Sequence, residues 1–183
     1  GVKDALAQGG RVSVIGPQGG TPLSAAAHEG HTDICGLLLA HGSDVNEMEL
    51  KTKMTALHCA AAIGHEAVVE ALLSWGAIVD PQDHLGRTPL FSACQEGHLA
   101  CVLALLKARA SVSMPDNTGN LPIHIAADNN RVEIVRTLLD YGCSPDMVSC
   151  CENTLTTIMT PFLLSAGQGA RVHTTQACSI GSS

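Results

Sequence analysis

The sequence predicts an all-α solenoid, in which four helix-turn-helix units follow one another along the chain. Three observations indicate this fold. A Thr-Pro-Leu-like opening recurs every 33 or 34 residues, at Thr21, Thr55, Thr88 and Leu121. Each opening leads into an Ala-rich segment that ends in Gly or Asn, and each Ala-rich segment is followed by a Leu-rich one. Such a unit cannot bury its apolar face alone, so neighbouring units must stack.

The first helix of each unit is predicted from its start and stop signals. Thr can accept a hydrogen bond from a free backbone N–H, and Pro suits the next position, where no N–H is needed. The Ala-rich segments "SAAAHEG", "HCAAAIG", "FSACQEG" and "HIAADNN" follow. Gly30, Gly64 and Gly97, with Asn130 in the fourth unit, supply the left-handed residue that ends each helix.

The second helix of each unit carries larger apolar groups, in "DICGLLLAHG", "AVVEALLSWG", "ACVLALLKAR" and "VEIVRTLLDYG". A Gly ends this helix in three units, at Gly42, Gly76 and Gly142. Arg109 stands at that position in the third unit, where a left-handed conformation costs about 1 kcal/mol. Turn formers such as "DHLG" and "DNTG" connect the units. The connection "ELKTKMT" has one extra residue and no Gly at its tip, so we expect an irregular turn there.

Composition excludes several classes of protein. The chain has 183 residues, 45% of them hydrophobic and only 2% aromatic, so its core must be built from Ala, Leu, Val and Ile. A net charge of −7 argues against a nucleic-acid or anionic-membrane surface. The sequence holds no apolar run of about 18 residues, so we expect no membrane insertion. Of the eight Cys, several fall inside apolar helical patterns, which indicates reduced thiols in an intracellular, cytoplasmic or nuclear compartment.

The repeated unit resembles the ankyrin repeat, whose pattern is T-P-L-H-x-A-A-x-x-G-H followed by a helix that ends L-L-x-x-G-A-D-V-N. The segment "TPLSAAAHEGHTDICGLLLAHGSDVN" matches nearly throughout. "TALHCAAAIGHEAVVEALLSWGAIVD" and "TPLFSACQEGHLACVLALLKARASVS" also match, and "LPIHIAADNNRVEIVRTLLDYGCSPD" keeps the register. The resemblance implies a solenoid whose units are joined by β-hairpin-like loops.

The repeat boundaries follow from this register. We predict ankyrin repeats at residues 21–54, 55–87, 88–120 and 121–153. Because "LAQGGRVS" aligns with "LAHGSDVN", residues 1–20 are predicted to be the tail and hairpin of a truncated preceding repeat. "TPFLLSAGQG" resembles a further first helix, so residues 154–171 are a predicted partial terminal repeat and residues 172–183 a disordered tail. The chain starts in mid-pattern without an initiator Met, so we expect a fragment of a larger chain.

The histidines have a structural interpretation in this pattern. His58 and His124 occupy the T-P-L-H position, and His31, His65 and His98 follow the Gly between the helices. The resemblance implies that these side chains tie loops together by hydrogen bonds.

A zinc site and a Cys/His hydrolase are the two chemical alternatives to packing for the Cys and His side chains. Cys94, His98 and Cys101 come nearest to a zinc site, but no second cluster with ligand spacing accompanies them. A Cys/His hydrolase would need an exposed thiol and a convergent His, whereas the Cys residues fall at core positions. Phosphate-binding and Ser-nucleophile motifs are absent from the sequence. We therefore expect no catalytic residue, no metal and no cofactor.

The resemblance implies a concave protein-binding face made of loop tips and first-helix ends. Met54, Ile63 and Leu85 would form its apolar centre, flanked by His84 and Arg87; the alternative is that the three apolar side chains pack against neighbouring loops. The contact positions carried over from the family are Gln18, His28, Glu29, Lys51, Met54, Ile63, His84, Leu85, Arg87, Gln95, Glu96, Asn117, Thr118, Asn120, Asp128 and Asn129.

The sequence allows two interpretations for each of three further residues. Trp75 and Tyr141 either edge this face or cover the next repeat. Asn46, in "LLAHGSDVN", matches the family motif for intracellular Asn hydroxylation, and its alternative role is to stabilise a turn. The predicted function is an adaptor or scaffold that binds another protein or peptide. The alternative is a regulatory or recruiting segment of a larger enzyme or channel.

Overall fold

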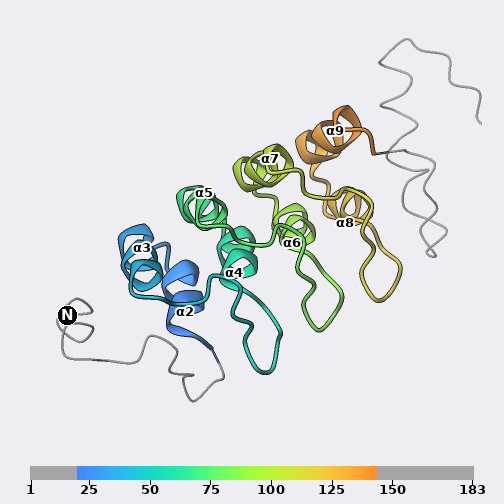
Figure 1. The fold of residues 1–183 in the computed structure, drawn as a ribbon. Helices are drawn as coiled ribbons and strands as arrows, with labels where there is room; N and C mark the ends of the chain where they lie inside the picture. Colours follow the sequence, from blue (N-terminus) through green and yellow to red (C-terminus); the bar gives the residue numbers. More distant parts are fainter. Residues whose placement is uncertain (1–19, 144–183) are drawn as a thin grey trace, which may run out of the picture. The chain divides into compact units, whose positions relative to one another are not determined.

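Helices form two rows in residues 20–143, the part of the chain that the computed structural model describes. The first row contains α2 (Pro22–His28), α4 (Ala56–Ile63), α6 (Pro89–Glu96) and α8 (Pro122–Asp128). The second row contains α3 (Thr32–Ala40), α5 (Glu66–Ser74), α7 (Leu99–Lys107) and α9 (Val132–Asp140). Each helix contacts its partner in the same repeat and the next helix of its own row (Figure 1). This arrangement confirms the all-α repeat solenoid.

The predicted partial repeats at both ends, like Gln18 and the predicted C-terminal tail, lie outside the described residues. Each of the four central predicted repeats holds one helix of each row.

Two of the four first-row helices follow the predicted Thr capping, whereas the Thr55 side chain makes no such cap hydrogen bond. The Thr21 hydroxyl accepts a hydrogen bond from the N–H of Ser24 at 3.0 Å, and the Thr88 hydroxyl accepts one from the N–H of Phe91 at 3.3 Å. Leu121 offers no side-chain acceptor at the same position. There the N–H of His124 bonds the backbone oxygen of Leu121 at 3.0 Å instead.

The helix ends use left-handed residues as expected. Gly64 and Gly97 cap α4 and α6 with φ of 95° and 93°. Asn130 takes the same role in the fourth repeat with φ of 55°. Arg109 also adopts the left-handed conformation, with φ of 67°, so the chain keeps the backbone geometry of the missing Gly.

The core is a continuous layer between the two rows. Leu72, Leu105 and Leu138, at equivalent positions of the second helices, are completely buried. Small Ala side chains in the first row, such as Ala60 and Ala93, are also completely buried, and their size lets the helices approach closely. Burial of aliphatic side chains between repeats therefore supplies the main stabilisation, as in other quasi-one-dimensional folds.

Three loops that connect successive repeats project side by side from the first row (Figure 1). Backbone hydrogen bonds close two of them in the same way, from Asp83 N–H to Arg87 O at 3.0 Å and from Asp116 N–H to Asn120 O at 2.9 Å. These loops are hairpin-like, although no strand is formed within residues 20–143.

The first of these loops is irregular, as its sequence predicted. Its closing hydrogen bond runs from Glu49 N–H to Met54 O at 2.9 Å and therefore spans one more residue than in the other two loops. Lys53 takes the left-handed conformation with φ of 54° in place of a Gly.

Candidate protein-binding face

We use the term binding face for a candidate surface that consists of two rows of residues, which repeat along the stack. The loop row consists of Leu50–Met54, His84–Arg87 and Asn117–Asn120. The helix-end row consists of the residue pairs His28–Glu29, Ala62–Ile63, Gln95–Glu96 and Asp128–Asn129, which lie at or just after the C-terminal ends of the first-row helices.

Side-chain hydrogen bonds hold the second and third loops of the loop row from inside. The buried carboxylate of Asp83 accepts hydrogen bonds from the N–H groups of Leu85 (2.8 Å) and Arg87 (2.9 Å). It also accepts two from the guanidinium of Arg87, at 3.0 and 2.9 Å. Burial opposes ionisation of Asp83, but the hydrogen bonds from Arg87 and Leu85 outweigh it and lower the pKa of the carboxyl. The Arg87 guanidinium is therefore hydrogen-bonded within its own loop.

The third loop is built in the same way. Asp116 accepts hydrogen bonds from the Thr118 N–H at 2.9 Å, the Thr118 hydroxyl at 2.7 Å and the Asn120 N–H at 2.8 Å. A short Asp side chain that bonds its own loop in this manner replaces bonds that would otherwise go to water.

Hydrogen bonds also join successive loops. The N–H of His84 donates to Thr52 O, and the N–H of Asn117 donates to Leu85 O, both at 2.9 Å. The Asn117 side chain adds a second bond, from Nδ2 to His84 O at 3.1 Å. The loop tips therefore form one connected surface.

In the helix-end row, histidine side chains that lie against glycines join the helix ends of successive repeats. His65 Nε2 bonds the backbone oxygen of His28 at 3.0 Å, and His98 Nε2 bonds that of Ala62 at 3.1 Å. A Cβ on Gly64 would come within 2.5 Å of Nδ1 of His98, so only Gly leaves room for this ring. The predicted tie role of these two histidines is confirmed.

The buried His58 is a third tie. The N–H of Thr55 donates to its Nδ1 at 3.2 Å, so Nε2 carries the hydrogen that is donated to Arg87 O at 3.0 Å. Burial is the main cause that lowers the pKa of His58. The neutral ring thus links the first helix of one repeat to the loop that begins the next, as predicted.

The two other predicted ties are His124 and His31. His124 accepts a hydrogen bond from the N–H of Leu121 at 3.1 Å through Nδ1, as His58 does from Thr55. His31 precedes α3 in the first described repeat, so the repeat to which it would bond lies outside residues 20–143.

The structure leaves most of the predicted contact residues accessible. Ile63 and Leu85 are each 43% exposed, whereas Met54 is half-buried and packs against the core. The exposed members are His28, Glu29, Lys51, Ile63, His84, Leu85, Glu96, Asn117, Thr118, Asp128 and Asn129, and the half-buried ones are Met54, Arg87, Gln95 and Asn120.

Sequence reasoning missed Leu50, which is 69% exposed in the first loop. The extra residue of "ELKTKMT" could have indicated this exposure. A longer loop cannot point all of its apolar side chains towards the core. Trp75 and Tyr141 follow the second-row helices α5 and α9 and are 50% and 48% exposed.

Asn46 links two successive loops. Its Oδ1 accepts a hydrogen bond from the N–H of Ile78 at 2.8 Å. Asp80, one repeat later, makes the equivalent bond to the N–H of Ser111 at 3.1 and 3.2 Å through its two oxygens.

The thiols are poorly suited to chemistry. Cys35, Cys59, Cys94, Cys101 and Cys143 are free and buried. Burial raises the pKa of Cys59 to about 12 and that of Cys101 to about 11, and it raises the pKa of Cys94 as well. A thiolate is the reactive form, so these residues are weak nucleophiles at neutral pH. Within residues 20–143, no group of three or more His, Cys, Asp and Glu side chains could hold a metal ion.

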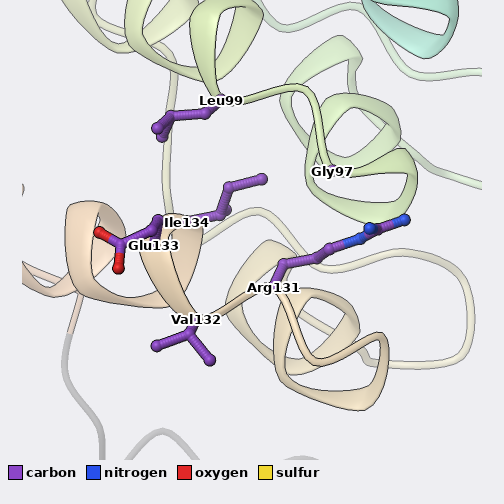
Figure 2. Close-up of a pocket in the computed structure, with 6 residues that line it drawn as sticks. All are labelled: Gly97, Leu99, Arg131, Val132, Glu133 and Ile134. Carbon is purple, nitrogen blue, oxygen red and sulfur yellow. The ribbon is translucent and has the colours of Figure 1, made fainter.

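A hollow of about 220 Å³ lies where the third and fourth repeats meet (Figure 2). It is smaller than the roughly 300–1,000 Å³ of typical ligand sites. Arg131 lies against Gly97 there, where His65 and His98 lie against glycines in the earlier repeats. The lining residues are Gly97, Leu99, Arg131, Val132, Glu133 and Ile134.

No helix within residues 20–143 combines the length and the apolar character needed to cross a membrane.

Comparisons with known proteins match these features. A family model described as ankyrin repeats (three copies) matches residues 2–83 and 76–149. The "Ankyrin repeat and KH domain-containing protein mask-1" of Caenorhabditis elegans is 40% identical over 94 residues, which are 51% of this chain and 4% of that protein. The "E3 ubiquitin-protein ligase XBAT33" of Arabidopsis thaliana is 45% identical over 74 residues, 40% of this chain and 14% of the ligase.

The "Ankyrin repeat and SOCS box protein 11" of Danio rerio is also 45% identical over 74 residues, 40% of this chain and 25% of that protein. The chain thus spans a small part of the length of these relatives. Ankyrin repeats are general protein–protein interaction modules. The matching family model covers most of the chain, and the described residues show the stacked helix pairs of that family, so the chain belongs to the ankyrin-repeat family.

Proposed function

We propose that the chain is a non-catalytic adaptor or scaffold module that binds a protein partner through the binding face. The observation that carries this proposal is a rigid, connected surface with apolar side chains exposed at its centre. Ile63 and Leu85 are accessible there, and Leu50 extends the apolar area along the first loop. An apolar centre with a polar rim is the usual anatomy of a protein interface.

Rigidity supports the proposal because ordering a flexible loop on binding costs free energy. Asp83 and Asp116 hold their loops in one shape, and the bond from Asn117 N–H to Leu85 O holds the two loops together. The partner therefore meets a surface that is already in its bound form.

A second role concerns the parent protein. Matched relatives include an E3 ubiquitin-protein ligase and a homologue of a transient receptor potential cation channel, and the chain spans only 14% and 6% of them. A regulatory or substrate-recruiting segment of a larger enzyme or channel would use the same face, with any reaction or conduction performed by other domains. We place the module inside the cell, in agreement with its free, buried thiols.

The test compares two double variants, one that removes exposed apolar side chains from the binding face and one that removes exposed apolar side chains elsewhere. Ile63→Ala with Leu85→Ala alters the binding face. Trp75→Ala with Ile78→Ala removes side chains that are 50% and 56% exposed but lie outside it. We expect partner capture from lysate to be lost only in the first variant, while both variants keep the wild-type thermal unfolding profile. Loss of capture in the second variant alone would refute the proposal.

Asn46 is a proposed hydroxylation site. Mass spectrometry of the chain purified from cells should detect one added oxygen on the peptide that contains Asn46. The equivalent peptide that contains Asp80 serves as the internal control. Failure to detect the modified peptide in cells that hydroxylate other ankyrin repeats would exclude the site.

A further inference from the structure

We propose that the helix-end row binds an extended basic segment in which one aliphatic residue lies between two cationic residues. This inference rests on the proposed function and specifies the chemistry of its partner. The three positions that carry it are Glu29, Ile63 and Glu96, which occupy the same place in three successive repeats.

The first step is that these positions form a line. His65 Nε2 bonds the oxygen of His28, next to Glu29, and His98 Nε2 bonds the oxygen of Ala62, next to Ile63. The ends of α2, α4 and α6 are thereby held side by side. Neighbouring packed helices lie about 9 Å apart, so the line rises by about 9 Å per repeat.

The second step is the charge along this line. The helix-end row contains three acidic residues, Glu29, Glu96 and Asp128, and no Lys or Arg, although the Arg131 side chain lies against Gly97, next to Glu96. Oε1 of Glu29 bonds the ring of His28 at 3.0 Å, and Oε1 of Glu96 accepts a hydrogen bond from Gln95 at 3.0 Å. Glu29 and Glu96 are both exposed, so a cation of the partner can reach their carboxylates.

The third step concerns Ile63, which is 43% exposed at the end of α4. The equivalent positions of the other three repeats hold polar residues, Glu29, Glu96 and Asn129. The repeat architecture therefore does not require an apolar side chain here. Partial burial by a partner would remove its apolar surface from water.

The fourth step is the match of spacing. A polyproline II segment has three residues per turn and rises roughly 3.1 Å per residue, so its positions i, i+3 and i+6 lie on one side about 9 Å apart. This repeat equals the spacing of the line. The predicted occupant has the pattern cation-x-x-aliphatic-x-x-cation in that conformation, with the cations near Glu29 and Glu96 and the aliphatic side chain on Ile63.

The test uses a fluorescent peptide, Arg-Pro-Pro-Leu-Pro-Pro-Arg, and measures its anisotropy with the full chain in low salt. A second peptide of the same composition places the two Arg next to each other. We expect the first peptide to bind at least fivefold more tightly than the second. Ile63→Ala and Glu96→Lys should each weaken it about fivefold. Glu70→Lys, which makes the same charge change at an exposed position of α5, should change it less than twofold.

Equal affinity for the two peptides, or an equal loss of affinity in Glu70→Lys and Glu96→Lys, would overturn this inference. Either result would show that the peptide is attracted by net charge and not by the spacing of the three positions. Circular dichroism of each variant checks that the helices remain. Failure here is separable from failure of the proposed function. If the Ile63/Leu85 variant still loses its captured partner while the peptide does not bind, only the specified partner chemistry is wrong.

Discussion

Replacement of Gly64 by Ala tests how the repeats are joined at the helix-end row. Gly64 and Gly76 both adopt left-handed conformations, with φ of 95° and 82°. A Cβ on Gly64 would come within 2.5 Å of His98 Nδ1, whereas a Cβ on Gly76 would meet no atom within 4 Å. The two substitutions thus share the backbone penalty and differ only in the contact with His98.

The magnitudes follow from these contacts. The left-handed conformation costs an Ala about 1 kcal/mol at either site. At Gly64 the His98 ring must also move, and its 3.1 Å hydrogen bond to Ala62 O is lost, which adds about 1 kcal/mol. We expect destabilisation of about 2 kcal/mol for Gly64→Ala and about 1 kcal/mol for Gly76→Ala.

Urea unfolding followed by circular dichroism measures both values. The double variant Gly64→Ala with His98→Ala supplies the decisive control. With the ring removed, the Gly64 substitution should cost only the backbone penalty of about 1 kcal/mol relative to His98→Ala alone. Equal costs at Gly64 and Gly76, or an unchanged cost at Gly64 without the His98 ring, would refute the reasoning.

Four further outcomes can be measured on the same chain. Arg109→Gly should raise the unfolding free energy by up to about 1 kcal/mol, because Arg109 holds φ of 67°; a decrease in urea titration would contradict this. Leu105→Ala should cost about 3 kcal/mol, because the side chain is fully buried, and an effect below 1 kcal/mol would show that the core collapses around the gap. The lowered pKa of His58 stabilises the fold above its unfolded value of 6.5, so stability should fall as pH drops below 6.5 towards the folded pKa, and the slope should shrink in His58→Gln. Cys101 should resist a thiol reagent at pH 7 until urea unfolds the chain, since burial raises its pKa to about 11; rapid labelling of the native form would show that the site opens.

Local signals in the sequence were sufficient for the helices. Thr at the start and Gly at the end act through hydrogen bonds and backbone conformations within a few residues, so their effect can be read without knowing the fold. Even the departures were informative, because Arg109 and the loop around Lys53 adopt the left-handed geometry that the pattern requires. The 33-residue period then predicted that the repeats stack, because a single unit cannot bury its apolar side.

The binding face was predictable only as a set of positions, carried over from the family resemblance. Which of its side chains are free depends on contacts between residues far apart in the chain. Met54 packs against the core, and Leu50 is exposed because its loop is one residue longer than the others.

By itself, therefore, the sequence determined the helices, their order and their repeat, because caps and periodicity act over short distances. Only the tertiary structure decided that Arg87 is held by Asp83, that His98 lies on Gly64, and that Glu29, Ile63 and Glu96 share one line. The physical reason is that these relationships arise when repeats are placed against one another, and stacking brings together residues more than 30 positions apart.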